Sequence, residues 1–341
     1  MNWKISIIYF LLVCQLPAFG QEIKFVSPIG GTYLRDYFIV RYVDCGKFDK
    51  QAKDPYCGSK TQKGHEGTDF FIRSFPQMDS LVPVYAVADG KIFFTKDSLY
   101  DRNNWSSERH YHGDNGYNLK WSNEVYGNHI VINHKDSLFT LYANLKKYSI
   151  KVKPGDSVKS GQLIAYVGSS GYTPTPYLHF EVRNKKNNND FVNPFQGSCG
   201  STKSLWVHEL AYDTITRVIA SGFVPYTPIR EDSLEERIYN GSDFEEHQPH
   251  ITHWVLISGL HKNDVLRTEW HQPDLTMWSS NQMVIKSDEW YSYFWSWTRN
   301  PILKGYYGDG WICAFFVNNR LIMKEKFNLR EQKKHSHKAD H

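Results

Sequence analysis

The first half of the chain alternates between short apolar runs and turn residues. Residues 82–92 form two apolar runs around Asp89-Gly90, and the runs 129–134 and 138–142 alternate apolar with polar positions. A period of two predicts strands that bury one face. Because no long stretch from 24 to 193 has the apolar spacing of a helix, this part is predicted to be antiparallel β structure.

The second half shows the same period with larger side chains. Aromatic residues occupy every other position from Tyr291 to Trp297, and a similar row of buried-type residues runs from Trp311 to Val317. Asn318-Asn319 then predicts a hairpin turn, because Asn tolerates positive φ. We therefore expect an all-β chain that ends in an immunoglobulin-like β-sandwich. The aromatic rows are expected to fill the sandwich core, with stacking on sugar rings as the alternative.

Three polar stretches interrupt these patterns. Residues 96–128 form a long polar and aromatic insertion, which is either a functional loop or a packed surface excursion. The charged stretch 229–250 predicts a loop with a short helix at 232–239, and 331–341 predicts a polar tail.

The aromatic residues divide the chain near residue 205. Eight of the 11 Trp follow that point, beginning with Trp206. We expect one domain over 21–204 and an aromatic-rich accessory domain over 205–330. A length of 341 residues suits about two domains.

The chain begins with an apolar segment that is too short to span a bilayer. Lys4 precedes the apolar run 5–13, and small residues follow at a cleavage site, which predicts a signal peptide over 1–20. A lipid anchor at Cys14 is less favoured, because Val13 stands where a small residue is needed. With no later apolar stretch of membrane-helix length, we expect an exported protein, periplasmic or extracellular.

Four cysteines follow the predicted signal peptide: Cys45, Cys57, Cys199 and Cys313. An even number in an exported chain predicts disulfides, with three pairings open. The short intervening loop favours Cys45 with Cys57, which leaves Cys199 with Cys313 by elimination. The alternative is that one or both of the latter pair remain buried thiols.

Charge and composition exclude some classes of protein. Lys+Arg 40 against Asp+Glu 36 gives a formal charge of +4, which argues against a dedicated nucleic-acid binder. Hydrophobic residues at 40% and aromatic residues at 16% exclude wholesale disorder. Composition thus indicates folded domains and leaves their chemistry open.

Candidate chemistry lies in the first half. His65 and Asp69 stand four residues apart where Gly67 and the following apolar residues indicate the start of a strand. A His and an Asp on one strand can supply two of the three or four ligands that zinc needs. His179 alternates with apolar residues on another predicted strand. Each signal is weak alone, because a surface loop could carry the same His and Asp spacing and a structural histidine could occupy the same place in a strand.

Seven blocks in a fixed order strengthen these signals. They read HEGTD, PVYAVADGKI, YGNHIVINH, LYANL, VKPGDSVKSGQLIAYVGSSG, YLHFEVR and VNPF. Together they resemble the LytM/lysostaphin-type zinc metallopeptidases, which cut peptide bonds in bacterial peptidoglycan. The resemblance spans roughly residues 27–195. It implies a compact antiparallel β domain with a zinc cleft along one sheet, and peptidoglycan peptides as the partner.

The resemblance assigns roles to five positions. Its metal ligands match His65, Asp69 and His179, which implies a bound Zn²⁺. Its two catalytic histidines are replaced: the family's Tyr-x-His-Leu block reads YANL with Asn144, and its His-x-His pair reads YLH with Tyr177. The implied metal site is therefore complete, whereas the implied proton-transfer residues are absent.

These replacements leave two hypotheses. In the family, zinc activates a water molecule and polarises the scissile carbonyl, and the histidines handle protons. Asn cannot accept a proton near pH 7, and Tyr, with an ordinary pKa of about 10, is a poor base. The protein is therefore either a zinc peptidase of peptidoglycan with impaired catalysis, or a non-catalytic pseudopeptidase. The latter would bind cell wall or activate a partner hydrolase.

Four other side chains are candidate substitute bases: Glu66, Glu181, His129 and His134. The two histidines are five residues apart in a predicted strand, so they should point to opposite faces. At most one of them then faces the cleft. The sequence alone places none of the four within reach of the metal.

Overall fold

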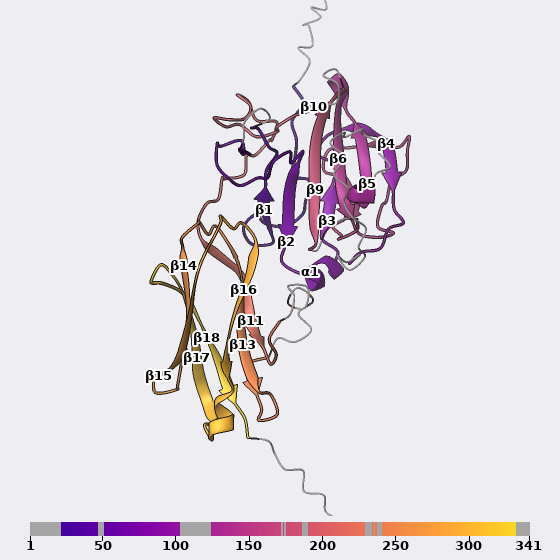
Figure 1. Ribbon diagram of the computed structural model, residues 1–341. Coiled ribbons are helices and arrows are strands. Elements are labelled where there is room, and N and C mark those ends of the chain that lie inside the picture. The colour runs from indigo at the N-terminus through magenta and orange to yellow at the C-terminus, as the bar shows by residue number, and fades with distance from the viewer. Residues whose placement is uncertain are drawn as a thin grey trace, which may run out of the picture.

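The structure is a computed structural model (Figure 1). It describes residues 22–46, 51–102, 124–171, 173, 175–185, 190–228, 234, 236 and 241–331. The predicted signal peptide, most of the insertion at 96–128, most of the helix expected at 232–239 and nearly all of the tail lie outside these residues. No helix in the described part of the chain is long and apolar enough to cross a membrane.

Strands are the main regular elements of the first domain. These are β1 Tyr37–Arg41, β2 Thr68–Ile72, β3 Pro83–Tyr85, β4 Gly90–Lys96, β5 Asn128–Asn133, β6 Leu138–Leu145, β7 Ser157–Val158, β8 Leu163–Tyr166, β9 Tyr177–Asn184 and β10 Asp190–Phe191. Its short helices are α1 Phe75–Asp79 and the 3-10 turns η1 Glu124–Tyr126 and η2 Lys135–Ser137. The strands predicted at 82–92, 129–134 and 138–142 correspond to β3 with β4, to β5 and to β6.

One antiparallel sheet dominates this domain. Its order is β1-β2-β9-β6-β5-β4-β7, with β10 paired to β9, while β3 and β8 form a separate ladder. Strand alternation sends Leu178 and Phe180 of β9 into the main hydrophobic core. Residues of the other parity on β9, including His179, therefore lie on the opposite face of the sheet.

The second domain contains the remaining strands. These are β11 Arg217–Val224, β12 Asp243–Phe244, β13 His250–Ser258, β14 Val265–His271, β15 Met277–Val284, β16 Ser292–Arg299, β17 Gly308–Val317 and β18 Arg320–Leu329, with the 3-10 helix η4 Pro301–Lys304. They form a three-stranded sheet, β11-β13-β16, and a five-stranded sheet, β12-β18-β17-β14-β15. The prediction of an all-β chain is confirmed.

The two sheets of the second domain share hydrophobic clusters. One cluster joins Phe223 and Ile251 of the smaller sheet to Trp270 and Trp311 of the larger. This is the packing expected of a β-sandwich, and its immunoglobulin-like character stays a prediction. The hairpin expected at Asn318-Asn319 connects β17 to β18, and both residues have positive φ.

The aromatic row on β16 does not lie where we expected it. Phe294 points between the two sheets, whereas Tyr293 and its neighbours of the same parity pack on the outer face of the smaller sheet. There Tyr293 joins Phe38 from β1 and Trp254 from β13. Trp297, at the far end of the row, is 47% exposed. The expected core position was wrong because the outer face is also buried, against the first domain.

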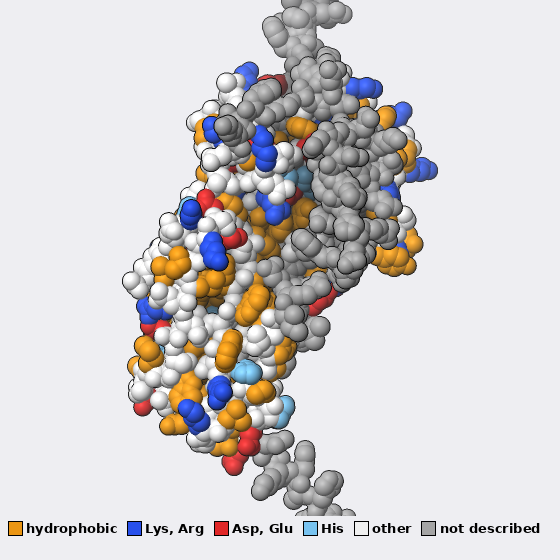
Figure 2. Space-filling model, viewed as in Figure 1, with side chains coloured by type: hydrophobic (Ala, Val, Ile, Leu, Met, Phe, Trp, Pro, Cys, Tyr) orange, Lys and Arg blue, Asp and Glu red, His pale blue; other side chains and the backbone are white. Residues whose placement is uncertain are grey.

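The two domains therefore meet through an apolar face. Figure 1 shows them stacked along the long axis of the molecule, with β11, β13 and β16 below β1 and β2. Figure 2 shows hydrophobic side chains gathered on the face where the domains meet, with basic side chains and a histidine surface nearby. Polar contacts add to this junction: Ser59 donates to Asp288 at 2.6 Å, and Lys60 donates to the Asp213 carbonyl at 2.9 Å.

The connection between the domains is longer than the sequence suggested. Trp206 packs against Phe25 and Phe180 in the core of the first domain, and Leu210 and Tyr212 also contact that core. The packing of the first domain thus extends past residue 205. The strands of the second domain begin with β11.

The disulfide prediction was wrong. Cys57 is bonded to Cys199, 142 residues away, while Cys45 and Cys313 are free thiols. The physical reason is tertiary. The turn holding Cys57 lies against the loop holding Cys199, where the Cys199 amide donates to the Pro55 carbonyl at 2.9 Å. The alternative of a buried thiol applies to Cys313, whose side chain lies in the sandwich core.

Candidate metal centre

The sheet register brings three residues to one point. Asp69 on β2 pairs directly with His179 on β9, two strands that are adjacent in the sheet. His65 stands four residues before Asp69, just ahead of β2. Gly67 allows this approach, because a Cβ there would come within 2.9 Å of the His179 ring and 2.5 Å of the Phe180 carbonyl oxygen. A strand entry, and not a helix face, therefore positions the first two residues.

Their polar atoms converge closely. The Nδ1 atom of His179 lies 2.7 Å from Oδ1 of Asp69, and Nε2 of His65 lies 3.1 Å from Oδ2 of the same carboxylate. One ligand atom from each residue falls within 4.8 Å of the others. We call His65, Asp69 and His179 the metal trio. The structure brings together all three ligands that the sequence proposed.

The outward ring nitrogens of the trio are also held. Nδ1 of His65 lies 2.7 Å from the Tyr42 carbonyl oxygen, and Nε2 of His179 lies 3.0 Å from Oε1 of Glu181. A metal-binding histidine usually donates its other N–H to a carbonyl or carboxylate, which fixes its tautomer and orientation. Both histidines therefore have the outer partners that a metal ligand needs.

A buried ion-pair chain supports Glu181. Arg183 donates to Glu181 at 2.6 Å, to Glu66 at 2.7 Å and to the Tyr126 hydroxyl at 3.2 Å. The Arg183 side chain is only 1% exposed. Since a buried charge needs such partners, this chain holds Glu181 in place behind His179.

The electrostatics of the trio favour a bound cation. Burial alone would raise the pKa of Asp69, but its contacts with His65 and His179 hold that pKa well below its usual range. Burial would lower the pKa of His179, yet its hydrogen bonds to Asp69 and Glu181 raise that pKa to about 10. Two imidazoles and an ionised carboxylate are a donor set that suits zinc, with a fourth position left for another ligand. The residues present fit the metal that the resemblance implies.

Asn144 has a structural role at the end of β6. Its backbone takes a φ of 58°, a conformation that Asn tolerates better than most residues. Its side-chain Nδ2 donates to the Ser170 carbonyl at 2.9 Å, and its own carbonyl accepts from the Gly168 amide at 3.0 Å. Asn144 thus ties β6 to the loop that precedes β9.

Tyr177 lies beside the trio on β9, but its ring is engaged. It stacks on Phe71 of β2 with ring centroids 4.6 Å apart and planes within 4° of parallel. Burial and the charge of Asp69 raise the pKa of Tyr177. The hydroxyl therefore stays protonated at neutral pH, so it can donate a hydrogen bond but is no base.

The four candidate substitute bases also have other partners. Glu66 and Glu181 are bound to Arg183, as described above. His134 contacts the Asp89 carbonyl and the Thr140 hydroxyl, each at 2.8 Å, and lies against Phe25 of the main core. His129 lies on the other face, against Phe94 and Tyr126. The prediction that the two histidines occupy opposite faces is confirmed.

Two residues near the trio were missed in the sequence. Arg183 follows His179 and Glu181 at the same period of two, so strand alternation could have placed it on their face. Arg41 pairs with Asp69 across β1 and β2, at 3.4 Å between Nη1 and Oδ2. Nothing in the sequence alone marks Arg41, because strand pairing brings it there.

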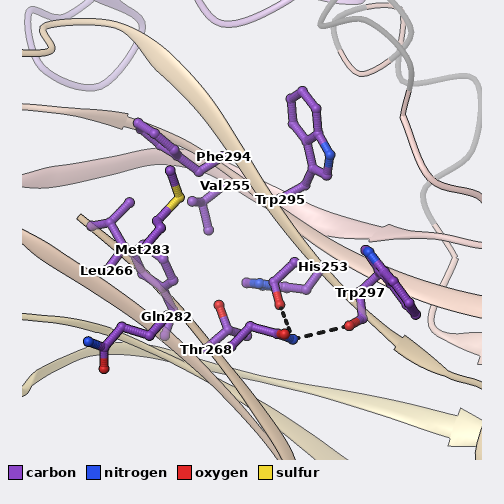
Figure 3. Close-up of a pocket in the computed structure, with 12 residues that line it drawn as sticks. His253, Val255, Leu266, Thr268, Gln282, Met283, Phe294, Trp295 and Trp297 are labelled. Atoms are coloured by element: carbon purple, nitrogen blue, oxygen red, sulfur yellow. Dashed lines mark hydrogen bonds between the residues drawn. The ribbon is translucent and has the colours of Figure 1, made fainter. Parts of the chain in front are cut away.

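A separate cavity of about 170 Å³ lies in the second domain, where β15 and β16 face each other. Figure 3 shows apolar Val255, Leu266 and Phe294 on one side and His253 and Thr268 on another. All residues that line it belong to the sandwich, so it is not part of the metal trio's site.

The antiparallel sheet places two imidazoles and a carboxylate around one point, as in a metal centre, and comparisons with known proteins specify the family. Residues 63–194 match the profile of Peptidase family M23. The chain is 33% identical over 132 residues to Glycyl-glycine endopeptidase ALE-1 of Staphylococcus capitis, covering 38% of this chain and 28% of that protein. It is 32% identical over 135 residues to Peptidoglycan DD-endopeptidase ShyB of Vibrio cholerae, covering 40% and 24%. The solved catalytic domain of the antimicrobial peptidase lysostaphin from Staphylococcus simulans is 28% identical, covering 41% and 78%, with a TM-score of 0.25.

The chain therefore contains a domain of peptidase family M23, the LytM/lysostaphin-type family. The metal trio, Asn144 and Tyr177 all fall within the matched residues. The chain spans about a quarter of the length of the curated relatives it matches. The second domain lies outside the matched range.

Proposed function

We propose that this is an exported, zinc-binding member of the M23 family that engages the peptide part of bacterial peptidoglycan, with impaired cleavage. The observation that carries the proposal is a contrast within one site. The metal trio is fully assembled and held by outer partners, whereas Asn144 and Tyr177 are committed to structural contacts. The names of the relatives ALE-1 and ShyB support a cell-wall peptide as the ligand.

The expected loss of activity follows from what each group can do. When bound, zinc would polarise a peptide carbonyl and activate water. Proton transfer by a positioned side chain typically contributes about 10²–10⁴ in rate, and one oxyanion donor about 10²–10³. Tyr177 can still donate a hydrogen bond, but neither it nor Asn144 can accept a proton near neutral pH. The site should therefore bind peptide better than it cleaves it.

The alternative function is that of a non-catalytic pseudopeptidase, which binds cell wall or activates a partner hydrolase. Tyr177 favours it, because Phe71, on which its ring stacks, also contacts Tyr291 of the second domain, with ring centroids 4.6 Å apart. A site whose catalytic position packs against an accessory domain suits binding more than turnover.

Export is supported by the disulfide. The bond between Cys57 and Cys199 is of the kind that persists in oxidising compartments. This agrees with the signal peptide expected at 1–20. We propose a periplasmic or extracellular location.

A rescue experiment tests the proposal. The double variant Asn144→His/Tyr177→His should raise the release of peptide fragments from purified peptidoglycan by about 10²–10⁴, because it restores proton-transfer groups. Histidine is among the residues that tolerate a positive φ, so Asn144→His is compatible with the backbone. Zinc content by elemental analysis should stay near one ion per chain in wild type and double variant.

Control variants show whether a gain in fragment release depends on the metal site. Tyr307→His, at an exposed position of the second domain, should leave fragment release unchanged. Asp69→Ala should abolish zinc binding and any release. Fragment release by the wild type that matches the double variant would contradict impaired catalysis. Absence of zinc from the wild type would overturn the metal site.

A further inference from the structure

Two arginines lie near the metal trio, and they differ in exposure and in the number of their hydrogen-bond partners. Arg183 is buried and donates to two carboxylates and a hydroxyl. The Arg41 side chain is 39% exposed. Among the described residues its guanidinium has one polar partner, Asp69, at 3.4 Å. A charge-assisted N–H···O bond is ordinarily about 2.7–2.9 Å long, so the contact with Asp69 is weak. Most of the N–H donors of Arg41 are therefore open to a ligand.

The histidines of the trio compete with Arg41 for the carboxylate of Asp69, which weakens the ion pair of Arg41. Oδ1 of Asp69 faces His179, and Oδ2 is shared between His65 at 3.1 Å and Arg41. A metal held by the trio would draw the carboxylate charge toward itself. Arg41 would then be an exposed cation beside the metal, without an equal counter-charge.

The geometry around Arg41 suits recognition of a carboxylate. Its guanidinium carbon lies 5.8 Å from the centroid of the Phe71 ring, which lies next to the trio on β2. The planar fork of a guanidinium matches the two oxygens of a carboxylate, and an aromatic face helps to hold its orientation. Because Arg41 touches a residue of the trio, a carboxylate bound to it would lie close to a peptide bond at the metal.

We propose that Arg41 binds a free carboxylate of the peptide, next to the bond that faces the metal. The inference rests on the proposed function and specifies its substrate class. The site would select cross-linked peptides in which the residue at the cross-link keeps its α-carboxylate. Uncharged glycyl-glycine bridges offer no such group inside the chain and would bind weakly.

Matched peptides test the role of Arg41. The probes are a synthetic cross-linked peptide with a free α-carboxylate beside the cross-link, its primary-amide analogue, and a pentaglycine with both ends blocked. Affinities are measured by calorimetry for zinc-loaded and metal-free full-length protein. The wild type should bind the acid about tenfold to a hundredfold more tightly than the amide or the pentaglycine, in the range of a charged hydrogen-bonded contact. Without zinc the preference should be smaller, because Asp69 then keeps its charge for Arg41, but it should remain above about twofold, which excludes the metal as its only source.

Variants then test whether the preference for the acid over the amide depends on Arg41. Arg41→Met keeps an unbranched apolar side chain without the charge and should reduce the acid-to-amide ratio to less than about twofold, with little change in amide binding and with zinc content retained. Arg41→Lys keeps a charge without the fork and should give an intermediate ratio. Arg35→Met, at an exposed arginine before β1, should keep the full ratio.

The outcomes separate the two proposals. Equal binding of acid and amide by the wild type, or a full ratio in Arg41→Met, overturns the role of Arg41 and leaves the proposed function standing. Absence of binding by all three peptides overturns both. If Arg41→Met fails to fold, the acid-to-amide ratios of wild type and Arg41→Lys decide.

Discussion

At the residue scale, the proposed metal ligands and Asn144 belong to different hydrogen-bond networks. The trio and its outer partners form one hydrogen-bonded chain that runs from Asp69 through His179 and Glu181 to Arg183. Asn144 lies in a different network, with Ser170. A substitution at Asn144 or Tyr177 can therefore change proton transfer while the metal ligands stay in place.

The outer carboxylate gives the residue-scale prediction. Glu181→Gln should weaken zinc binding by about 10–100-fold, because Glu181 orients His179 and raises its basicity. Competition with a chelating dye measures the affinity. Glu22→Gln, at an exposed position, is the matched control and should bind zinc as the wild type does. An unchanged affinity in Glu181→Gln would mean that His179 does not depend on this contact.

At the element scale, β2 connects the metal site to both domains. One side chain of β2, Asp69, belongs to the trio, and Phe71 lies between Tyr177 and Tyr291. The Tyr291 hydroxyl also donates to the Ile72 carbonyl at 3.0 Å. The second domain thus fixes the strand that carries the central ligand.

The Tyr291 contact gives the element-scale prediction. Tyr291→Phe should lower the free energy of unfolding by about 0.5–1.5 kcal/mol, the usual net value of one hydrogen bond. Tyr291→Ala should lower it further, because the ring contact with Phe71 is lost as well. Urea denaturation followed by tryptophan fluorescence measures both. Tyr307→Phe, at an exposed tyrosine, should stay within about 0.5 kcal/mol of wild type. A Tyr291→Ala variant as stable as wild type would show that the domains are not coupled here.

At the scale of the whole molecule, long-range contacts hold the first domain together. The disulfide joins Cys57, in the turn before β2, to Cys199, after the last strand of that domain. Closing a loop of 142 residues restricts the unfolded chain strongly. The apolar interface through Phe38 and Tyr293 then joins the two domains.

The disulfide gives the whole-molecule prediction. The double variant Cys57→Ser/Cys199→Ser should lose about 2–5 kcal/mol of unfolding free energy, the range for removal of a native disulfide. Cys45→Ser, at a free thiol, should lose far less. Addition of a reducing agent should lower the unfolding free energy of the wild type to that of the double variant. The unfolding free energy of the double variant should not change. If the reductant does not affect the wild type, the bond contributes nothing to stability.

The trio and several strands of the first domain were predictable from the sequence for local reasons. His65 and Asp69 are four residues apart, the period of two along β9 marks His179, and the block order carried the family. The Asn318-Asn319 hairpin was likewise readable, because two adjacent asparagines tolerate positive φ. In each case the signal lies within a few consecutive residues.

Local patterns in the sequence thus predicted most of the strands, and the family resemblance predicted the three metal ligands and the replacement of two histidines by Asn144 and Tyr177. Sheet register and domain packing settled which cysteines pair, what buries the outer face of β16, and that Arg41 lies beside the metal trio. The reason is that alternation specifies the two faces of a strand but not what covers them. Partners that are 28 or 142 residues apart in the chain are set by sheet register and domain packing.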